Sequence, residues 1–332
     1  MTRKEGLILG IESSCDDTAA AVVDFDGRVL SSVVVGQIDV HQAYGGVFPE
    51  MASRAHAAAI VPTIQKALED AGVNGRDLRA IGVTRGPGLI GPLLVGLGAA
   101  AGLGIGWNVP VIGINHLRGH LRSADLEQKR VEFPAVILLV SGGHTLLASM
   151  KDVANIEIIG TTRDDSVGEA YDKVGRMMGL GYPAGAAVDR LARSGHPSIE
   201  MPRPMLQGFD FSFSGLKSAV ARHFPIQDGT AVEDIAASFV QACMDVLISK
   251  SERALVKYSP RTFVVVGGVA ASPQLRERAH ELCDRQGLQL CLPPLKWSTD
   301  NAAMIALATW DYLALDSPPR PIVHPNLRLD QF

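Results

Sequence analysis

Apolar and polar residues in the first third of the chain follow first a strand period and then a helix period. Short apolar runs at residues 7–11, 19–23 and 29–35 are separated by acidic and Asp-Gly turns, which predicts a meander of three strands. Residues 49–71 carry apolar side chains at helical spacing and predict a helix that opens on a proline. After it we expect strands at 80–84 and 109–112, and helices at 92–106 and from 116 onward.

The second half of the chain repeats this plan after a polar break at residues 126–134. It opens with a buried strand at 135–140, a glycine turn and another strand at 156–160. Further along we expect helices at 168–178, 185–193, 232–256, 273–286 and 300–313, a strand at 263–266 and a long loop at 196–213. The repetition predicts an α/β protein of two duplicated lobes with a central ligand cleft; one large doubly wound sheet is the alternative.

The predicted elements also suggest lobe boundaries. We expect an N-terminal lobe at residues 1–130, a C-terminal lobe at 131–300 and a tail at 316–332. The last helix, at about 300–315, is expected to pack back on the N-terminal lobe. A chain of 332 residues is long enough for two such lobes, each with its own core.

Composition narrows the class of protein. The chain is 47% hydrophobic and has 34 glycines, which is typical of an α/β protein with many tight turns. Its most apolar window, residues 89–107, is interrupted by glycines, so we expect a buried helix there and no membrane span. The first residues lack a signal-peptide pattern, and the four cysteines form neither a disulfide framework nor a zinc motif, which indicates a cytoplasmic protein.

The charge limits how the chain can meet nucleic acid. Its net charge is −4 and its pI about 6.1, so it lacks the positive field that supplies most non-specific affinity for polynucleotides. A polynucleotide substrate must therefore meet a local patch or the surface of a partner.

Three segments have the form of a strand that runs into small, hydroxyl or acidic residues. They are Gly10–Thr18 (GIESSCDDT), Leu139–Thr145 (LVSGGHT) and Val265–Ser272 (VVGGVAAS). Such turns can present backbone N–H groups and hydroxyls to a phosphate, and the glycines of the third leave room for an adenine ring. Ordinary hairpins and close strand–helix packing would explain the same residues. The first two segments open the two halves, which favours a nucleotide gripped from both sides.

His116 and His120 lie four residues apart, on one face of a predicted helix, which is a standard way to present two metal ligands. Leu117 stands where a metalloprotease has its catalytic glutamate, so a metallopeptidase is disfavoured. A third ligand should be a carboxylate that leaves positions open for substrate oxygens, and Asp300 is the best candidate. The alternative is a pair of polar histidines that caps a helix.

Three further residues suit the hydroxyl groups of a ligand. Asp172 lies on a predicted helix, and Gly185 and Asp189 lie at the start of the next one. Helix capping and packing explain these residues equally well. Residues 211–217 (FSFSGLK) suit a mobile loop that contacts substrate, and the alternative is that their two aromatic side chains are buried. We interpret the four cysteines, His56 and His223 as structural.

Six motifs, taken together and in order, resemble one family. They are GIESSCDDT at 10–18, RGPGL-x-G at 85–91, H-x-x-x-H at 116–120, VSGGHT at 140–145, DFSFSGLK at 210–217 and STDN at 298–301. Over nearly its whole length the chain resembles the bacterial TsaD family, the tRNA adenosine threonylcarbamoyltransferases of the actin-like ATPase superfold. The resemblance implies transfer of a threonylcarbamoyl group from threonylcarbamoyl-adenylate to N6 of the adenosine just 3′ of the anticodon, in tRNAs that read codons beginning with A.

The resemblance also implies roles for individual residues. It makes His116, His120 and Asp300 the ligands of one divalent metal, iron(II) or zinc. It makes Leu139, Val140, Ser141, Gly142 and Gly143 the lining of the acyl-adenylate site, together with Asp172, Gly185, Asp189 and Ser272. The family usually has asparagine where this chain has Ser272, which keeps a hydroxyl but loses an amide. Because the exocyclic amine is a poor nucleophile, proton removal helps, and Glu12, Asp16 and Asp17 are candidate bases.

Relatives in this family act with other proteins. The resemblance implies a tRNA substrate, a paralogous actin-like partner (TsaB), a small ATPase (TsaE) and an adenylate supplied by a separate synthase (TsaC), with no membrane. The glycine-rich helix at 92–106 is the expected docking face. Two other functions remain open: a kinase or carbamoyltransferase of the same superfold that acts on a small molecule, and a scaffold whose nucleotide regulates partner binding. The histidine pair with Asp300 argues against an ordinary sugar kinase.

Overall fold

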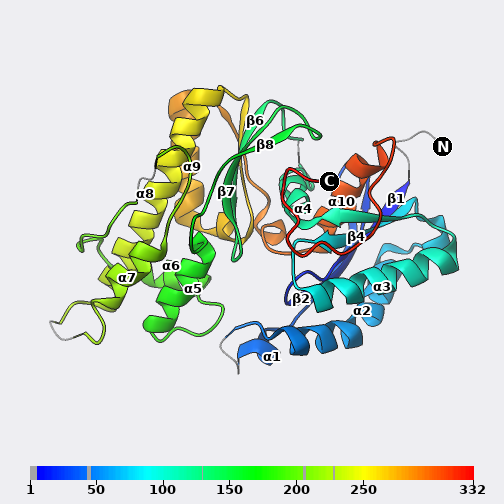
Figure 1. Ribbon diagram of the computed structural model, residues 1–332, viewed down its shortest axis with the longest axis horizontal. Helices are drawn as coiled ribbons and strands as arrows, with labels where there is room; N and C mark the ends of the chain where they lie inside the picture. The colour runs from blue at the N-terminus through cyan, green and yellow to red at the C-terminus, as the bar shows by residue number, and fades with distance from the viewer. Residues whose placement is uncertain (1–5, 43–45, 129, 205–206, 227–228) are drawn as a thin grey trace. The chain divides into compact units, whose positions relative to one another are not determined.

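The computed structural model describes residues 6–42, 46–128, 130–204, 207–226 and 229–332 (Figure 1). The chain forms two compact units. Unit 1 comprises Met1–Arg130 and Pro293–Phe332, and unit 2 comprises Val131–Leu292. The chain therefore returns to unit 1 at Pro293, earlier than the boundary at residue 300 expected from the sequence, and the C-terminal segment belongs to unit 1.

The sheet of unit 1 has five strands in the order β3-β2-β1-β4-β5. They are β1 (Leu7–Glu12), β2 (Asp17–Asp24), β3 (Val29–Gly36), β4 (Ala80–Gly86) and β5 (Val111–Asn115). The first three pair antiparallel, as a meander does, whereas β1, β4 and β5 pair parallel. The predicted strands of this half are confirmed, although β5 begins at Val111 rather than at residue 109.

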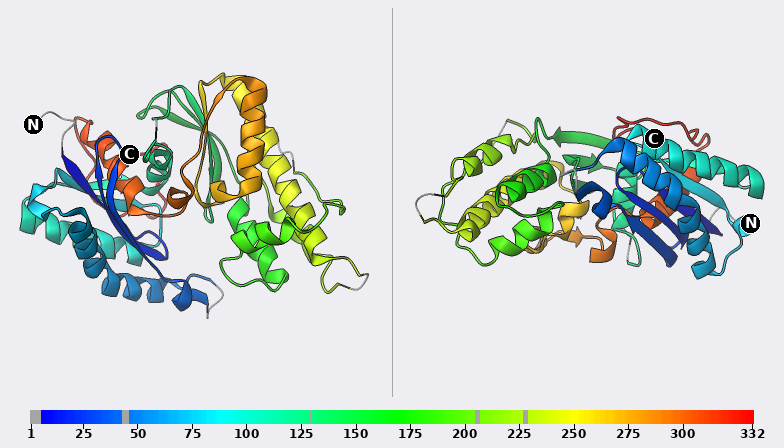
Figure 2. Two further views of the ribbon diagram at one scale, coloured as in Figure 1. Left: turned by 180° about the vertical axis from the view of Figure 1, so that it is seen from behind. Right: turned by 90° about the horizontal axis from the view of Figure 1, so that it is seen from below.

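Helices cover both faces of this sheet (Figure 2). α2 (Pro49–Ala71) and α3 (Ile90–Trp107) pack on one face and α10 (Ala302–Leu313) on the other. Successive side chains of β1 divide between the two cores, since Leu9 packs on the α2 and α3 side and Ile8 on the α10 side. This double burial explains why the strands read as continuous apolar runs. The other helices of unit 1 are α1 (Ile38–Gln42), α4 (His116–Ser123) and the short turns η1 (Gly75–Asp77) and η3 (Leu295–Trp297).

The sheet of unit 2 has the order β10-β9-β6-β7-β8. Its strands are β6 (Ala135–Val140), β7 (Thr145–Met150), β8 (Ile156–Thr161), β9 (Thr262–Val266) and β10 (Gln289–Cys291). β6, β7 and β8 pair antiparallel, and β6, β9 and β10 pair parallel. Read from the other edge, this is the sheet of unit 1 strand for strand, with β6 in the place of β1. The duplicated plan is confirmed, and a single large sheet is excluded.

One predicted loop of unit 2 is instead the start of a helix. The helices of this unit are α5 (Val167–Met177), α6 (Gly185–Ala192), α7 (Ser214–Ala221), α8 (Val232–Tyr258), α9 (Pro273–Gln286) and the short η2 (Gly268–Ala271). Asp164 accepts hydrogen bonds from the backbone N–H groups of Phe213 and Ser214, and so fixes the start of α7. Phe211 and Phe213 are fully buried. Residues 211–217 therefore form a packed turn and the first residues of α7 rather than a loop.

α3 is only partly buried, contrary to expectation. Among the described residues, α3 is a helix whose length and composition would allow it to cross a membrane. Only 33% of it is buried. It packs against α2 and β4 within unit 1, which is how an apolar helix packs in the core of a globular protein. Leu94 and Ile105 are 56% and 85% exposed, so the remaining face of α3 is apolar and open.

Candidate functional site

The two histidines of the predicted metal site lie one turn apart on α4, which follows β5 without a loop. Asn115, the last residue of β5, caps this helix, because its side-chain oxygen accepts a hydrogen bond of 3.0 Å from the Leu117 N–H. The rings of His116 and His120 meet edge to face with their centroids 4.7 Å apart. Both residues are buried, at 8% and 0% exposure.

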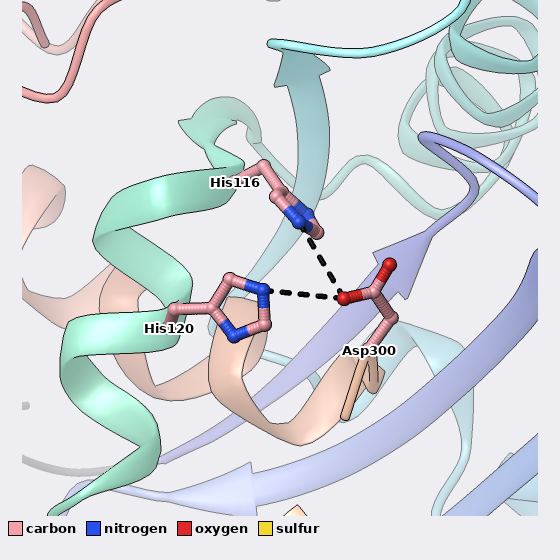
Figure 3. A group of neighbouring side chains, drawn as sticks. All are labelled: His116, His120 and Asp300. Carbon is pink, nitrogen blue, oxygen red and sulfur yellow. Dashed lines mark ion pairs between the residues drawn. The ribbon is translucent and has the colours of Figure 1, made fainter. Parts of the chain in front are cut away.

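Asp300, just before α10, completes a cluster of three side chains (Figure 3). Its Oδ1 atom lies 3.2 Å from Nε2 of His120 and 3.6 Å from Nε2 of His116. One ligand atom from each residue lies within 4.8 Å of the other two. Nε2 of His120 is buried and forms no hydrogen bond of good geometry, and coordination of an ion would satisfy this nitrogen. Two imidazoles and one carboxylate are the ligands that iron(II) and zinc accept in open sites.

Glu12 supports His116 from the side away from Asp300. Its Oε2 atom lies 2.9 Å from Nδ1 of His116 and accepts a hydrogen bond of 2.6 Å from the Thr84 hydroxyl. Its Oε1 atom accepts one of 2.5 Å from the Ser14 N–H. A carboxylate can only accept, so it holds the proton on Nδ1 and leaves Nε2 to face Asp300. This geometry favours a positioning role for Glu12, whereas we expected a catalytic base.

The carboxylates around His116 change its protonation. Burial alone would lower the pKa of His116, but the charges of Glu12 and Asp300 outweigh it and raise this pKa to about 9. For Glu12 the directions are opposite: burial alone would raise its pKa, but the charge of His116 outweighs burial and holds this pKa below its usual range. Burial, together with the charges of Asp16, Asp300 and Glu12, raises the pKa of Asp17 to about 7. Asp17 can therefore exchange a proton near neutral pH.

In unit 2, the turn between β6 and β7 leaves its backbone open. The side chains of Leu139 and Val140 are buried in the core, so only their backbone can meet a ligand. Ser141 closes the turn, since its N–H donates to the His144 carbonyl and its hydroxyl accepts from the His144 N–H. Gly142 and Gly143 are exposed, and a Cβ on either would meet no atom within 4 Å.

Asp172, Gly185 and Asp189 lie close together where α5 meets α6. Asp172 on α5 accepts a hydrogen bond of 2.8 Å from the Ala184 N–H, and Gly185 is the first residue of α6. Asp189 follows one turn later and is buried. The structure thus places Asp172 within α5, and Gly185 and Asp189 in the first turns of α6.

Ser272 neighbours Asp189, although the two are far apart in the sequence. Burial raises the pKa of Asp189, and the hydroxyls of Ser272 and Tyr171 and the charge of Arg193 oppose this shift. No hydrogen bond of good geometry joins these groups, because Asp189 Oδ1, Ser272 Oγ and Tyr171 OH are all buried without a partner. Three unsatisfied polar atoms in one place indicate a site for polar groups of a ligand or for water.

Three residues of these sites were missed in the sequence. Thr84 holds Glu12, Ser14 contacts the His116 ring, and Tyr171 lies beside Asp189. Ser14 lies inside a motif that we singled out, but none of the three has a spacing that signals its contact.

Comparison with known proteins identifies relatives over most of the chain. The model of the family described as "TsaD: tRNA N6-adenosine threonylcarbamoyltransferase" matches residues 28–307. A tRNA N6-adenosine threonylcarbamoyltransferase of Symbiobacterium thermophilum is 49% identical over 92% of this chain and 91% of its own. One of Bacillus cereus is 46% identical over the same shares of the two chains.

Solved structures share the fold at low sequence identity. HypF of T. kodakarensis aligns with a TM-score of 0.65 over 93% of this chain and 48% of its own, at 12% identity. Component A of the (R)-2-hydroxyglutaryl-CoA dehydratase of Acidaminococcus fermentans aligns with a TM-score of 0.55 over 94% of this chain and 100% of its own, at 16% identity. These likenesses concern the fold alone, and they confirm the actin-like ATPase architecture.

Proposed function

The chain belongs to the TsaD family of tRNA N6-adenosine threonylcarbamoyltransferases, and from this membership we propose the sites, ligands and partners described below. The chain is a tRNA-modifying transferase that adds a threonylcarbamoyl group to N6 of an adenosine. The single observation that carries this conclusion is the 49% identity that extends over 92% of the chain. We take the acceptor to be the adenosine just 3′ of the anticodon in tRNAs that read codons beginning with A.

The reaction that we propose uses threonylcarbamoyl-adenylate as the donor. The N6 amine forms a C–N bond to the carbamoyl carbon, the bond from that carbon to the phosphate oxygen breaks, AMP leaves, and the amine gives up one proton. The donor already carries a good leaving group, so the enzyme must chiefly position two reactants and stabilise charge on the carbamoyl oxygen.

His116, His120 and Asp300 would hold one divalent ion, iron(II) or zinc. Support comes from the convergence of their ligand atoms within 4.8 Å and from the buried Nε2 of His120, which forms no hydrogen bond of good geometry. The ion would supply Lewis-acid stabilisation of the developing negative charge. Glu12 keeps the His116 ring oriented for this role. Both oxygens of Glu12 already accept hydrogen bonds, so Asp17 is better placed than Glu12 to accept the amine proton.

Residues of unit 2 would bind the adenylate. The exposed backbone at Gly142 and Gly143 suits the phosphate, because the space that a Cβ would occupy on either residue is open. The unpaired oxygen of Asp189 and the unpaired Ser272 hydroxyl suit the hydroxyl groups of a ribose. Asp172 and Gly185, together with the backbone of Leu139, Val140 and Ser141, would complete this site.

The partners that we propose are a TsaB-like paralogue, a TsaE-like ATPase and a TsaC-like synthase that supplies the adenylate in the cytoplasm. A groove of about 720 Å³ between α2 and α3 supports a docking face for the paralogue. Val61, Leu68 and Leu103 help line it, and Gly98 and Gly102 leave open space there. With 31 basic and 35 acidic residues, the chain alone has no net field that would concentrate tRNA.

The test supplies synthetic threonylcarbamoyl-adenylate and unmodified tRNA to the purified chain, with and without the TsaB-like and TsaE-like proteins. We expect the modified nucleoside, seen by mass spectrometry, to appear in proportion to AMP when the partners are present. A matched tRNA with guanosine at the target position should stay unmodified. No modification in the presence of partners would contradict the activity, whereas efficient multi-turnover modification by the isolated chain would contradict only the partner requirement.

A further inference from the structure

The loop between β1 and β2 determines the surroundings of His116. Its Ser14 hydroxyl lies 3.2 Å from Nδ1 of the imidazole. The Ser14 N–H also donates to Glu12, whose other oxygen lies 2.9 Å from the same nitrogen. A shift of this loop would therefore change both polar neighbours of Nδ1 at once.

α3 holds this loop from one side. The Ser13 hydroxyl donates a hydrogen bond of 3.0 Å to the Pro92 carbonyl. The Leu89 N–H donates one of 2.8 Å to the Ser14 carbonyl. Gly96 lets α3 approach, because a Cβ there would lie 2.3 Å from the Ser13 hydroxyl oxygen.

His56 of α2 holds the loop from another side. It is fully buried, and its Nε2 atom lies 3.1 Å from the Cys15 carbonyl oxygen while its Nδ1 atom lies 2.7 Å from the Thr18 hydroxyl oxygen. A carbonyl only accepts, so Nε2 must carry the proton, and Nδ1 then accepts from Thr18. Burial lowers the pKa of His56, which keeps the ring neutral and therefore able to both donate and accept. One side chain thus ties Cys15 in the loop and Thr18 near the start of β2 to α2.

We propose that His56 is a positioning residue for the metal site. It holds the loop between β1 and β2 in place, so that Ser14 and Glu12 keep the His116 ring oriented. The inference rests on the metal site proposed above. His56 is 0% exposed, and its two hydrogen bonds go to the Thr18 hydroxyl and the Cys15 carbonyl rather than to a proposed ligand, so it acts through the loop. Removal of a residue that hydrogen bonds to a metal-ligating histidine typically weakens metal affinity by about tenfold to a hundredfold. Because His56 acts only through the loop, we expect a loss near the lower end of this range.

The experiment measures Co²⁺ affinity by competition with a chelator, together with the visible spectrum of the cobalt-loaded protein. His56→Leu removes both hydrogen bonds and should weaken binding about tenfold and alter the spectrum. His56→Gln keeps a donor near the position of Nε2 and should restore most of the affinity. His56→Asn keeps only an acceptor near Nδ1 and should behave like His56→Leu. Thr63→Val, which removes another buried polar group of α2 that bonds only the Ala59 carbonyl, should bind cobalt as the unmodified protein does.

Hydrogen exchange gives a readout that does not depend on metal. In the metal-free His56→Leu protein, amides of residues 12–19 should exchange faster, while those of α10 keep their rates. Faster exchange with unchanged cobalt affinity and spectrum would overturn the inference, and so would unchanged exchange. If His56→Leu does not fold, the Gln and Asn variants decide, and equal affinity in the two would overturn it.

His120→Ala separates the inference from the proposed metal site. Loss of cobalt in His120→Ala together with normal binding in His56→Leu would overturn the role of His56 alone. Normal binding in His120→Ala would overturn the metal site and the inference with it.

Discussion

The loop after β1 and the turn after β6 occupy the same position in the two duplicated sheets, yet they are built in opposite ways. In the first, Glu12, Ser13 and Ser14 are buried and hydrogen bonded to β4, α3 and α4. In the second, Gly142 and Gly143 are exposed with no neighbour for a Cβ. One copy of the motif has become a fixed support for side chains, and the other has kept an accessible backbone. Equivalent places in a duplicated fold can therefore serve different chemistry.

The largest effect is expected on metal binding, when the proposed ligands next to the loop after β1 are removed. The double variant His116→Ala, His120→Ala should lose bound metal completely, because only Asp300 of the proposed set remains. The fold should survive, since Asn115 still caps α4 and α10 still packs on it. Elemental analysis after purification measures the metal, and circular dichroism checks the fold. His223→Ala with His280→Ala, which removes two histidines from unit 2, is the control; stoichiometric metal in the first variant would disprove the site.

A glycine-to-alanine substitution in each unit compares the packing of the two units directly. At Gly10 a Cβ would lie 2.1 Å from the Ala302 backbone oxygen, so Gly10→Ala should destabilise unit 1 by about 3 kcal/mol. Gly142→Ala meets no atom within 4 Å and should change stability by less than about 0.5 kcal/mol. Trp107, Trp297 and Trp310 all belong to unit 1, so tryptophan fluorescence during urea unfolding reports on Gly10→Ala, and circular dichroism, which follows both units, reports on Gly142→Ala. Equal midpoints for Gly10→Ala and the unmodified chain would contradict this account of β1.

The sequence predicted most elements of both units because the signals are local. The period of apolar residues, the Asp-Gly turn and the proline at position 49 lie within the segments whose structure they predict. His116 and His120 were found for the same reason, since one helix turn brings them together. The start of α7 was missed because its cap, Asp164, is distant in the sequence. The contacts of Glu12 with Thr84 and His116 could not be predicted, because they depend on how β1, β4 and α4 meet, which no local pattern encodes.

The open turn should be sensitive to side chains only when a ligand is bound. Gly142→Val places a branched side chain where we expect the adenylate phosphate, so affinity for a non-hydrolysable threonylcarbamoyl-adenylate analogue should fall at least tenfold, or about 1.4 kcal/mol. Calorimetric titration measures this, and circular dichroism should match the unmodified protein because the site is exposed. Gly179→Val is an unsuitable control, since its φ of 73° would strain valine, whereas Gly215→Val in α7 adds the same group away from the turn. Unchanged affinity in Gly142→Val would make Ser141–Gly143 a simple hairpin.

The most gradual effect is expected in the dependence of metal affinity on pH, which is set by His116 and its contact with Glu12. The pKa of His116 is raised to about 9 in the metal-free protein, so the ring carries a proton at neutral pH that a metal must displace. Affinity should therefore rise with pH by at most tenfold per unit up to about pH 9 and level off above it. Calorimetry in buffers of different ionisation enthalpy should detect the released proton. Glu12→Gln removes one of the two charges that raise this pKa, so the rise should level off at a lower pH, closer to the ordinary value of 6.5. An affinity that is constant between pH 7 and 9 would show that His116 is already neutral, and the tight contact between Glu12 and its ring would then serve orientation alone.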